Sequence, residues 1–332
     1  MNPIFSLILI LSIFCLPQLQ AKVRILTFHY NRPEFLELQI RTLQKFIQDD
    51  YELFIFNDAK SDTIRDAINE ICARHSVNCL RYEQEWHHLN PVNETLRGHF
   101  QNPSIKSYLG FRYTGDVTDL PSVRHAHVIQ FALDRFGYTH DDLVVILDGD
   151  MFPIRPVSIH ALQENYDVIG LYRFVPKQNI GYLWVPFISL NMPRLPNKSE
   201  VKFDLALVNG MLADTGTAFY NYLKRHPGVS VKTYPNFEKS YSYRAMSNEK
   251  MRELGFTDDE ISYCQELNTG LKHSRGLETE INLNPTIVDS GVEFHIDRRF
   301  LHFGGSSYGG GKVKTLSTIK FLNAIILCID SN

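Results

Sequence analysis

The sequence predicts an α/β protein, with a mostly parallel sheet flanked by helices in a single domain. Residues 23–82 alternate between strand-like and helix-like patterns, and such alternation is typical of parallel sheets covered by helices. The most hydrophobic strand-like run after residue 22 is 143–147, and two acidic residues follow it closely. No break in composition divides the 332 residues. We therefore expect one domain with a ligand site at the carboxyl edge of its sheet.

The first elements follow from short patterns. Residues 23–28 are apolar and partly β-branched, which predicts a strand. Pro33 is suited to the first turn of a helix, and apolar residues recur after it at helical spacing up to Ile47. Residues 53–56 predict a second strand, Ser61 the start of a second helix, and residues 78–82 a third strand.

The later elements are less regular. Residues 87–119 are polar and predict a long loop, after which Pro121 opens a helix. Shorter strand-like runs follow at 168–171, 183–188 and 205–208, with a helix near 217–223 and a further strand at 300–303. An amphipathic pattern near the end predicts a C-terminal helix, 314–332, packed on the domain that spans 22–313.

The composition and the net charge exclude some classes of protein and some kinds of binding partner. Hydrophobic residues make up 44% and charged residues 21%, which excludes a disordered or fibrous chain. The formal net charge is −3, from 34 basic and 37 acidic residues, so we expect no nucleic-acid partner.

The N-terminus has the pattern of a signal peptide. Residues 4–16 carry no charge, a run too short for a membrane span, and the small residue Ala21 precedes Lys22. We expect residues 1–21 to be a cleaved signal peptide, and the protein to be exported to a periplasm, a secretory lumen or the exterior. The alternative is an uncleaved anchor, which is the one membrane contact that we expect.

Four cysteines lie after this segment, and none has the spacing of a metal site. Cys72 and Cys79 are close in sequence and could pair in an oxidising compartment, and Cys264 and Cys328 are far apart. Buried free cysteines explain such a scatter equally well.

Asp148 and Asp150, separated by Gly149, directly follow the apolar residues 144–147. Two carboxylates crowded at a strand end repel each other unless a cation neutralises them. Hard divalent cations such as Mg²⁺ or Mn²⁺ take oxygen ligands and bridge carboxylates to phosphates. The pattern therefore indicates a metal site, the alternative being a solvated acidic turn.

Several short segments, taken in the order in which they occur along the chain, resemble segments of glycosyltransferases of the GT-A fold. These enzymes use nucleotide-sugar donors. Residues 25–33 resemble the opening strand and nucleotide-binding turn of that family, and residues 54–58 resemble its second strand. Residues 145–151 resemble its metal-binding D-x-D strand, and residues 301–305 with the later lysine resemble its closing segment. Here the closing loop is longer and richer in glycine than the family form, and the family's N-x-G segment is one residue short at 207–211.

The resemblance implies a set of site residues. A divalent cation, Mn²⁺ or Mg²⁺, is expected on Asp148, Asp150 and His302. The nucleotide-sugar donor is expected to contact a second set, namely Thr27, Tyr30, Arg32, Asp58, Arg124, Gly304, Gly305 and Lys312. Glycine amides and a lysine suit phosphate on physical grounds as well. No acidic motif identifies a catalytic base, and Asp204 and Asp289 are the candidates near the acceptor.

Three function classes remain open. The first is a metal-dependent glycosyltransferase acting from a nucleotide sugar, with a UDP-sugar as first candidate, on a glycan, lipid or protein acceptor. The second is a secreted protein of the same fold that binds nucleotide or carbohydrate without catalysis. The third is a phosphohydrolase of the haloacid-dehalogenase type. Its D-x-D belongs to the first strand and is usually followed by Thr or Ser, whereas here the motif lies in mid-chain before Met151.

Overall fold

The computed structural model describes residues 22–83, 121–175, 179–208, 211–235, 248–253, 258, 292–297 and 299–303. The expected signal peptide (1–21), the expected loop over 87–119 and the expected C-terminal helix (314–332) lie outside these ranges. Among the helices within them, none has the length and apolar character needed to cross a membrane.

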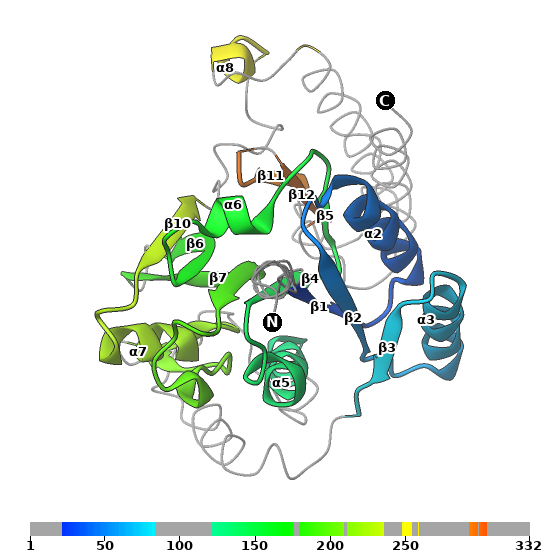
Figure 1. Ribbon diagram of the computed structural model, residues 1–332, viewed down its shortest axis with the longest axis horizontal. Helices are drawn as coiled ribbons and strands as arrows, with labels where there is room; N and C mark the ends of the chain where they lie inside the picture. The colour runs from blue at the N-terminus through cyan, green and yellow to red at the C-terminus, as the bar shows by residue number, and fades with distance from the viewer. Residues whose placement is uncertain are drawn as a thin grey trace, which may run out of the picture.

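The centre of the fold is a seven-stranded sheet in the order β10-β6-β7-β4-β1-β2-β3 (Figure 1). All its strands run parallel except β7, which is antiparallel to both neighbours. In chain order its strands are β1 (Val23–His29), β2 (Tyr51–Asn57), β3 (Asn78–Arg81), β4 (Leu143–Asp148), β6 (Val168–Val175), β7 (Ile180–Asn191) and β10 (Val231–Pro235). The structure thus confirms the predicted mostly parallel α/β sheet.

Helices cover both faces of this sheet. On one face lie α2 (Pro33–Phe46), α3 (Asp62–Arg74) and the short α6 (Ile159–Gln163). On the other lie α5 (Pro121–Ala132) and α7 (Thr217–Arg225), as Figure 1 shows. Because both faces are covered, the central strands are apolar throughout rather than alternating.

Strand β4 shows this arrangement most clearly. Val145 and Leu147 pack into the core beneath α2, α3 and α6, whereas Val144 and Ile146 pack into the core beneath α5 and α7. All four side chains are at most 1% exposed. Each such side chain contributes about 1.5–3 kcal/mol of burial free energy, so β4 is firmly held up to the acidic residues at its end.

A small antiparallel sheet of three strands lies against α2. It consists of β5 (Met151–Pro153), β12 (Phe300–Phe303) and β11 (Val292–His295), with β12 in the middle. Phe35 of α2 packs edge-on against Phe152 of β5 and Phe303 of β12, with ring centroids 5.6 and 5.7 Å away. This contact fixes β12 beside β5, the segment that follows β4.

The remaining elements are short. They are a π-helical turn (Leu133–Gly137), a 3-10 turn (Lys198–Glu200), the hairpin of β8 (Leu207–Val208) with β9 (Met211–Leu212), and α8 (Asn248–Glu253).

Some predicted boundaries differ from the structure. The strand expected at 183–188 is the middle of the longer β7, and the one expected at 205–208 is only Leu207–Val208. Helix α2 ends at Phe46, before the expected Ile47, which is extended and forms a bridge with Val157. Ile47 is still buried, because this bridge brings it against the same core as the helix.

Candidate metal and nucleotide site

The acidic turn lies at the carboxyl edge of the central sheet. Asp148 ends β4 and pairs in register with Phe28 of β1, and Asp150 immediately precedes β5. A Cβ atom at Gly149 would meet the carbonyl oxygen of Phe28 and lie 2.9 Å from His29 Cε1. Since real Cβ atoms do not approach so closely, glycine is the residue that lets the two acids stand on this tight turn.

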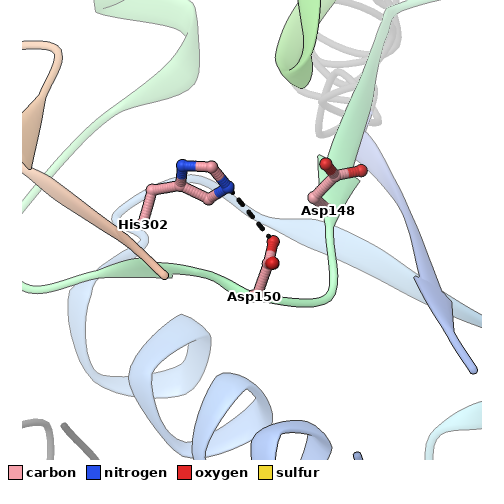
Figure 2. A group of neighbouring side chains, drawn as sticks. All are labelled: Asp148, Asp150 and His302. Carbon is pink, nitrogen blue, oxygen red and sulfur yellow. Dashed lines mark ion pairs between the residues drawn. The ribbon is translucent and has the colours of Figure 1, made fainter. Parts of the chain in front are cut away.

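Strand pairing brings His302 to the acidic turn from more than 150 residues away in the sequence. His302 of β12 pairs with Met151 of β5, and the amide of Phe303 donates to the carbonyl oxygen of Asp150 at 2.9 Å. As a result His302 Nε2 lies 3.3 Å from Asp150 Oδ1, and Figure 2 shows the two side chains pointing toward each other. Asp148 approaches from the end of β4 on the other side of the turn.

These three side chains have the geometry of a cation site. One ligand atom from each of Asp148, Asp150 and His302 can be chosen so that all lie within 4.8 Å of one another. Two carboxylates and one imidazole suit Mn²⁺ or a similar divalent ion. His302 is only 3% exposed, and both acids are partly exposed to the cavity. The donor set therefore fits the predicted cation.

A buried glutamine supports the turn from below. Gln39 of α2 is 0% exposed, and its amide nitrogen donates to the carbonyl oxygens of Asp148 at 2.7 Å and Met151 at 2.8 Å. Its amide oxygen accepts from Thr27 Oγ1 at 2.8 Å and lies 3.0 Å from His29 Nε2. Burial lowers the pKa of His29 to about 4, so this imidazole is neutral at pH 7.

This arrangement corrects one expectation. Thr27 was expected to contact the nucleotide, but its side chain is 0% exposed and donates its hydroxyl to Gln39. It lies beneath the site because it points toward α2 rather than to the open edge of the sheet. Thr27 therefore helps to position the acidic turn and offers no surface to a ligand.

Asp58 and Arg124 form one wall of the cavity above the acidic turn. Arg124 Nη2 donates to the carboxylate of Asp58 at 2.5 Å and to its carbonyl oxygen at 2.7 Å. The guanidinium carbon lies 4.9 Å from the centre of the Tyr30 ring. Burial raises the pKa of Asp58 to about 7, although the charges of Arg124, His125 and Arg81 oppose the rise. Tyr30, Arg32, Asp58 and Arg124, which belong to the predicted donor-binding set, all line the cavity.

His125 is a cavity residue that the sequence analysis did not identify. Its Nε2 lies 2.8 Å from Asp148 Oδ1, and its ring packs edge-on against Phe28. Burial alone would lower the pKa of His125, but Asp148, by its charge and hydrogen bond, raises it above 6.5, helped by the charges of Asp150 and Asp214. When His125 is protonated, its charge therefore partly balances that of the acidic turn. The one signal for it is the run of basic and imidazole side chains at 124–127 in an otherwise apolar helix.

The cavity holds a further acid that the sequence did not reveal. Asp214, just before α7, lines the cavity together with Trp184, Val185 and Thr215. Its carboxylate accepts from the Thr215 amide at 2.8 Å and lies 3.6 Å from Arg173 Nη1. Arg173 lies over the Trp184 ring at 5.0 Å, and that ring packs edge-on against His302 at 5.1 Å. These contacts connect Asp214 through Arg173 and Trp184 to His302. The hydroxyl of Thr215 donates to the carbonyl oxygen of Ser122 on α5 at 2.8 Å, which ties Asp214 to the helix that carries Arg124 and His125.

The remaining predicted site residues lie elsewhere. Asp204 was a candidate acid near the acceptor, but it is not among the described residues that line the cavity. It lies 4.0 Å from His127 Nε2, and burial raises its pKa to about 6. It belongs to the packing between α5 and the segment before α7, because His127 faces away from the cavity while Arg124 and His125 face into it. Asp289, Gly304, Gly305 and Lys312 lie outside the described residues.

The fold and site together define an α/β protein with a candidate divalent-cation site in an open cavity at the carboxyl edge of its sheet. The cavity has a volume of about 250 Å³ between its described walls. Its lining includes two guanidinium groups, a phenol ring, an indole and four carboxylates.

No protein-family model matches this chain, and no match is found among curated protein sequences. Among solved structures it is similar to glucosyl-3-phosphoglycerate synthase from Mycobacterium tuberculosis in complex with phosphoglyceric acid, with 11% identity over 76% of this chain and 81% of that one and a TM-score of 0.38. It is also similar to a mannosyltransferase from Pyrobaculum calidifontis in complex with GDP-Man and Mn²⁺, with 11% identity over 94% and 87% and a TM-score of 0.38.

Proposed function

We propose that this protein is a metal-dependent glycosyltransferase that moves a sugar from a nucleotide-sugar donor, with a UDP-sugar as first candidate, to an acceptor hydroxyl. The observation that carries the proposal is the meeting of Asp148, Asp150 and His302 within 4.8 Å at the edge of a parallel sheet. Such an edge is where α/β proteins bind nucleotides. A divalent cation bound there would neutralise charge on the departing diphosphate.

The wall of the cavity that Asp58 and Arg124 form supports the binding of an anionic donor. Arg124 is held by Asp58 and lies against Tyr30, so its guanidinium is fixed in place before any ligand arrives. Arg32 lines the same part of the cavity and is held 3.2 Å from Glu34. Positive groups that are already oriented stabilise developing negative charge without reorganisation. We assign Arg124 and Arg32 to the donor side, and Tyr30 and Asp58 to positioning Arg124 there.

One carboxylate of the cavity is available as a proton acceptor. We assign Asp214 as the group that receives the acceptor proton, because it lines the cavity and belongs neither to the candidate cation ligands nor to the ion pair of Asp58 with Arg124. In the transfer step, the acceptor oxygen bonds to the anomeric carbon while the bond from that carbon to the diphosphate oxygen breaks. The electron pair of the broken bond leaves with the diphosphate, and the hydroxyl proton passes to Asp214. A single displacement of this kind inverts the anomeric centre.

The test is donor binding and turnover on the purified protein. UDP and GDP, each with and without Mn²⁺, are screened for a rise in unfolding temperature, because a ligand that binds only the folded state stabilises it. Release of UDP or GDP from a panel of nucleotide hexoses then measures turnover. We expect one nucleotide to bind in Mn²⁺, and its hexose donor to be turned over in the same conditions.

The outcomes separate the three function classes. Nucleotide binding without release from any donor would favour a binding protein. Hydrolysis of p-nitrophenyl phosphate without nucleotide binding would favour a phosphohydrolase. Failure of both nucleotides to bind in Mn²⁺ would contradict the proposal.

The expected export also stays a proposal, motivated by the uncharged residues 4–16 and Ala21. N-terminal sequencing of the protein from its native cells tests it. An intact cytosolic form that begins at Met1 would contradict it.

A further inference from the structure

The side chains of Cys72 and Cys79 meet between helix α3 and the edge strand β3. Cys72 is 1% exposed on α3, Cys79 is partly exposed on β3, and both are free thiols. Cys79 Sγ lies 3.4 Å from Oδ1 of Asn69, which is three residues before Cys72 on α3. Residues at this spacing are neighbours on a helix surface. The Cys79 sulfur therefore lies on the side of α3 that carries Cys72, packed against the same core cluster, and each thiol shifts the pKa of the other.

The connection between the two cysteines is tight and internally bonded. The Val77 amide donates to the Cys72 carbonyl oxygen at 3.1 Å, and the Ser76 amide donates to the Ala73 carbonyl oxygen at 3.2 Å. Strand β3 is itself held by parallel pairing with β2, in which Cys79 is opposite Ile55. The two sulfurs are thus brought together by ordered backbone on both sides, and neither element has to unfold for them to react.

We propose that Cys72 and Cys79 form an intramolecular disulfide by exchange with a disulfide reagent such as glutathione disulfide, with Cys79 attacking and Cys72 resolving. The Cys79 thiolate attacks one sulfur of glutathione disulfide, which forms a mixed disulfide and releases one glutathione. The Cys72 sulfur, after losing its proton, then attacks the Cys79 sulfur and releases the second glutathione. Two protein thiols are oxidised, and one disulfide molecule is reduced to two thiols.

Exposure and charge set the order of the two steps. The attacking sulfur must be reachable by the reagent, and Cys79 is the partly exposed one, whereas Cys72 is buried against the core. The hydrogen bond from Cys72 lowers the pKa of Cys79, whereas that hydrogen bond, together with burial, raises the pKa of Cys72. Because the thiolate is the nucleophile in exchange, Cys79 reacts first.

The disulfide would fasten an edge of the central sheet. Strand β3 is the last strand of the sheet on its side and consists of four residues. A covalent link to α3 limits its fraying, because the unfolded chain loses conformational freedom when the loop is closed. We expect dithiothreitol to lower the unfolding temperature of the oxidised protein by a few degrees.

The chain offers a direct test because Arg74 lies between the two cysteines. Trypsin cleaves after Arg65, Arg74 and Arg81, which places Cys72 in peptide 66–74 and Cys79 in peptide 75–81. The full chain is incubated with glutathione disulfide, alkylated, and digested without reduction. We expect the two peptides to appear as one linked species, lighter than their sum by two hydrogen atoms. Recovery of both peptides separately, each alkylated, would overturn the proposal.

Single variants test the order of attack. Cys72→Ser has no resolving sulfur and should accumulate glutathione on peptide 75–81. Cys79→Ser should leave Cys72 unmodified while the protein is folded, because that sulfur is buried. The reverse pattern, with glutathione on Cys72 of Cys79→Ser and none on Cys79 of Cys72→Ser, would contradict the assignment of Cys79 as the attacking residue. The wild-type digest requires no variant, so it shows whether the disulfide forms even if a variant folds poorly.

Discussion

Gln39 donates a hydrogen bond of 2.7 Å to the carbonyl oxygen of Asp148, which ties helix α2 to the acidic turn of the site. The second hydrogen of the same amide group binds the carbonyl oxygen of Met151. One buried side chain therefore holds the backbone on both sides of Gly149 and Asp150. The orientation of the two carboxylates therefore depends on these two hydrogen bonds as well as on β4.

Replacing Gln39 should damage both stability and the site. In Gln39→Leu the carbonyl groups of Asp148 and Met151 lose their donor, and Thr27 loses its acceptor. Leaving buried polar groups unpaired should lower the free energy of unfolding by about 2–4 kcal/mol, measured by urea denaturation. Gln44→Leu, on the exposed side of the same helix, is the matched control. An equal free energy of unfolding in the two variants would show that the hydrogen bonds of Gln39 do not stabilise the protein.

The glycine between the two acids is the second target. In Gly149→Ala the new methyl group would overlap the Phe28 carbonyl and lie 2.9 Å from His29 Cε1, so the turn must shift. We expect a loss of about 1–3 kcal/mol of stability, the usual cost of overpacking, and a clear loss of Mn²⁺ binding measured by calorimetry. At Gly228 an added Cβ has nothing within 4 Å, so Gly228→Ala is the control. A Gly149→Ala protein with native Mn²⁺ affinity would contradict the tight turn.

An imidazole far from the cavity should give the protein a pH-dependent stability. His160 Nδ1 lies 3.0 Å from Asp49 Oδ1, and its Nε2 lies 3.0 Å from Asp142 Oδ2. Burial alone would lower the pKa of His160, but its hydrogen bonds with Asp49 and Asp142 and their charges raise it above 6.5. A group whose pKa is raised by folding stabilises the protein below its unfolded pKa, and this stabilisation is lost as pH rises through the folded value.

The comparison for this prediction is wild type against His160→Gln in thermal unfolding. The wild type should be the more stable protein at pH 5.5, and the difference should shrink as the pH is raised to 8.5. A difference that is constant over this range, or grows with pH, would show that the two ion pairs do not depend on the charge of His160.

Asp214 should affect turnover and leave nucleotide binding intact. Asp214→Asn keeps the shape of the side chain but cannot accept a proton, so the rate of donor turnover should fall by about a hundredfold or more. The rise in unfolding temperature with UDP and Mn²⁺ should be unchanged. Asp204→Asn removes a partly buried acid that does not line the cavity, and it should keep the wild-type rate.

The configuration of the released sugar adds an independent readout. Proton NMR early in the hydrolysis of an α-linked donor should show the β-anomer, because a single displacement inverts the anomeric carbon. Early release of the α-anomer would contradict the role given to Asp214, without affecting the assignment of the metal ligands.

The sequence predicts the parts of this molecule that depend on local patterns. The apolar residues 144–147 followed by Asp148 and Asp150 identify both a central strand and the acidic turn, because burial on two faces leaves an unmistakable run of apolar side chains. The alternation of strand and helix patterns over 23–82 likewise predicts β1 to β3 with α2 and α3 between them.

The rest of the site depends on contacts across the fold. Gln39 resembles any polar residue of an amphipathic helix, and only the position of α2 beneath the turn gives it a role. His125 and His127 are two residues apart on α5, yet one faces Asp148 and the other faces Asp204. Asp214 precedes a short helix that no pattern links to β4. The prediction of His302 depends on the family resemblance and on the glycine-rich loop that follows it, since the pairing of β12 with β5 has no local signal.

The most direct test of the central claim is a calorimetric titration of the protein with Mn²⁺, in the presence and absence of UDP. The wild type should bind one Mn²⁺, more tightly with UDP present. Asp150→Asn, which is nearly isosteric, should weaken Mn²⁺ binding by about a hundredfold or more without lowering the unfolding temperature. Asp141→Asn makes the same change at an exposed acid just before β4 and should bind Mn²⁺ as the wild type does. Mn²⁺ binding of equal strength in all three proteins, or in none of them, would contradict a metal site formed by Asp148, Asp150 and His302.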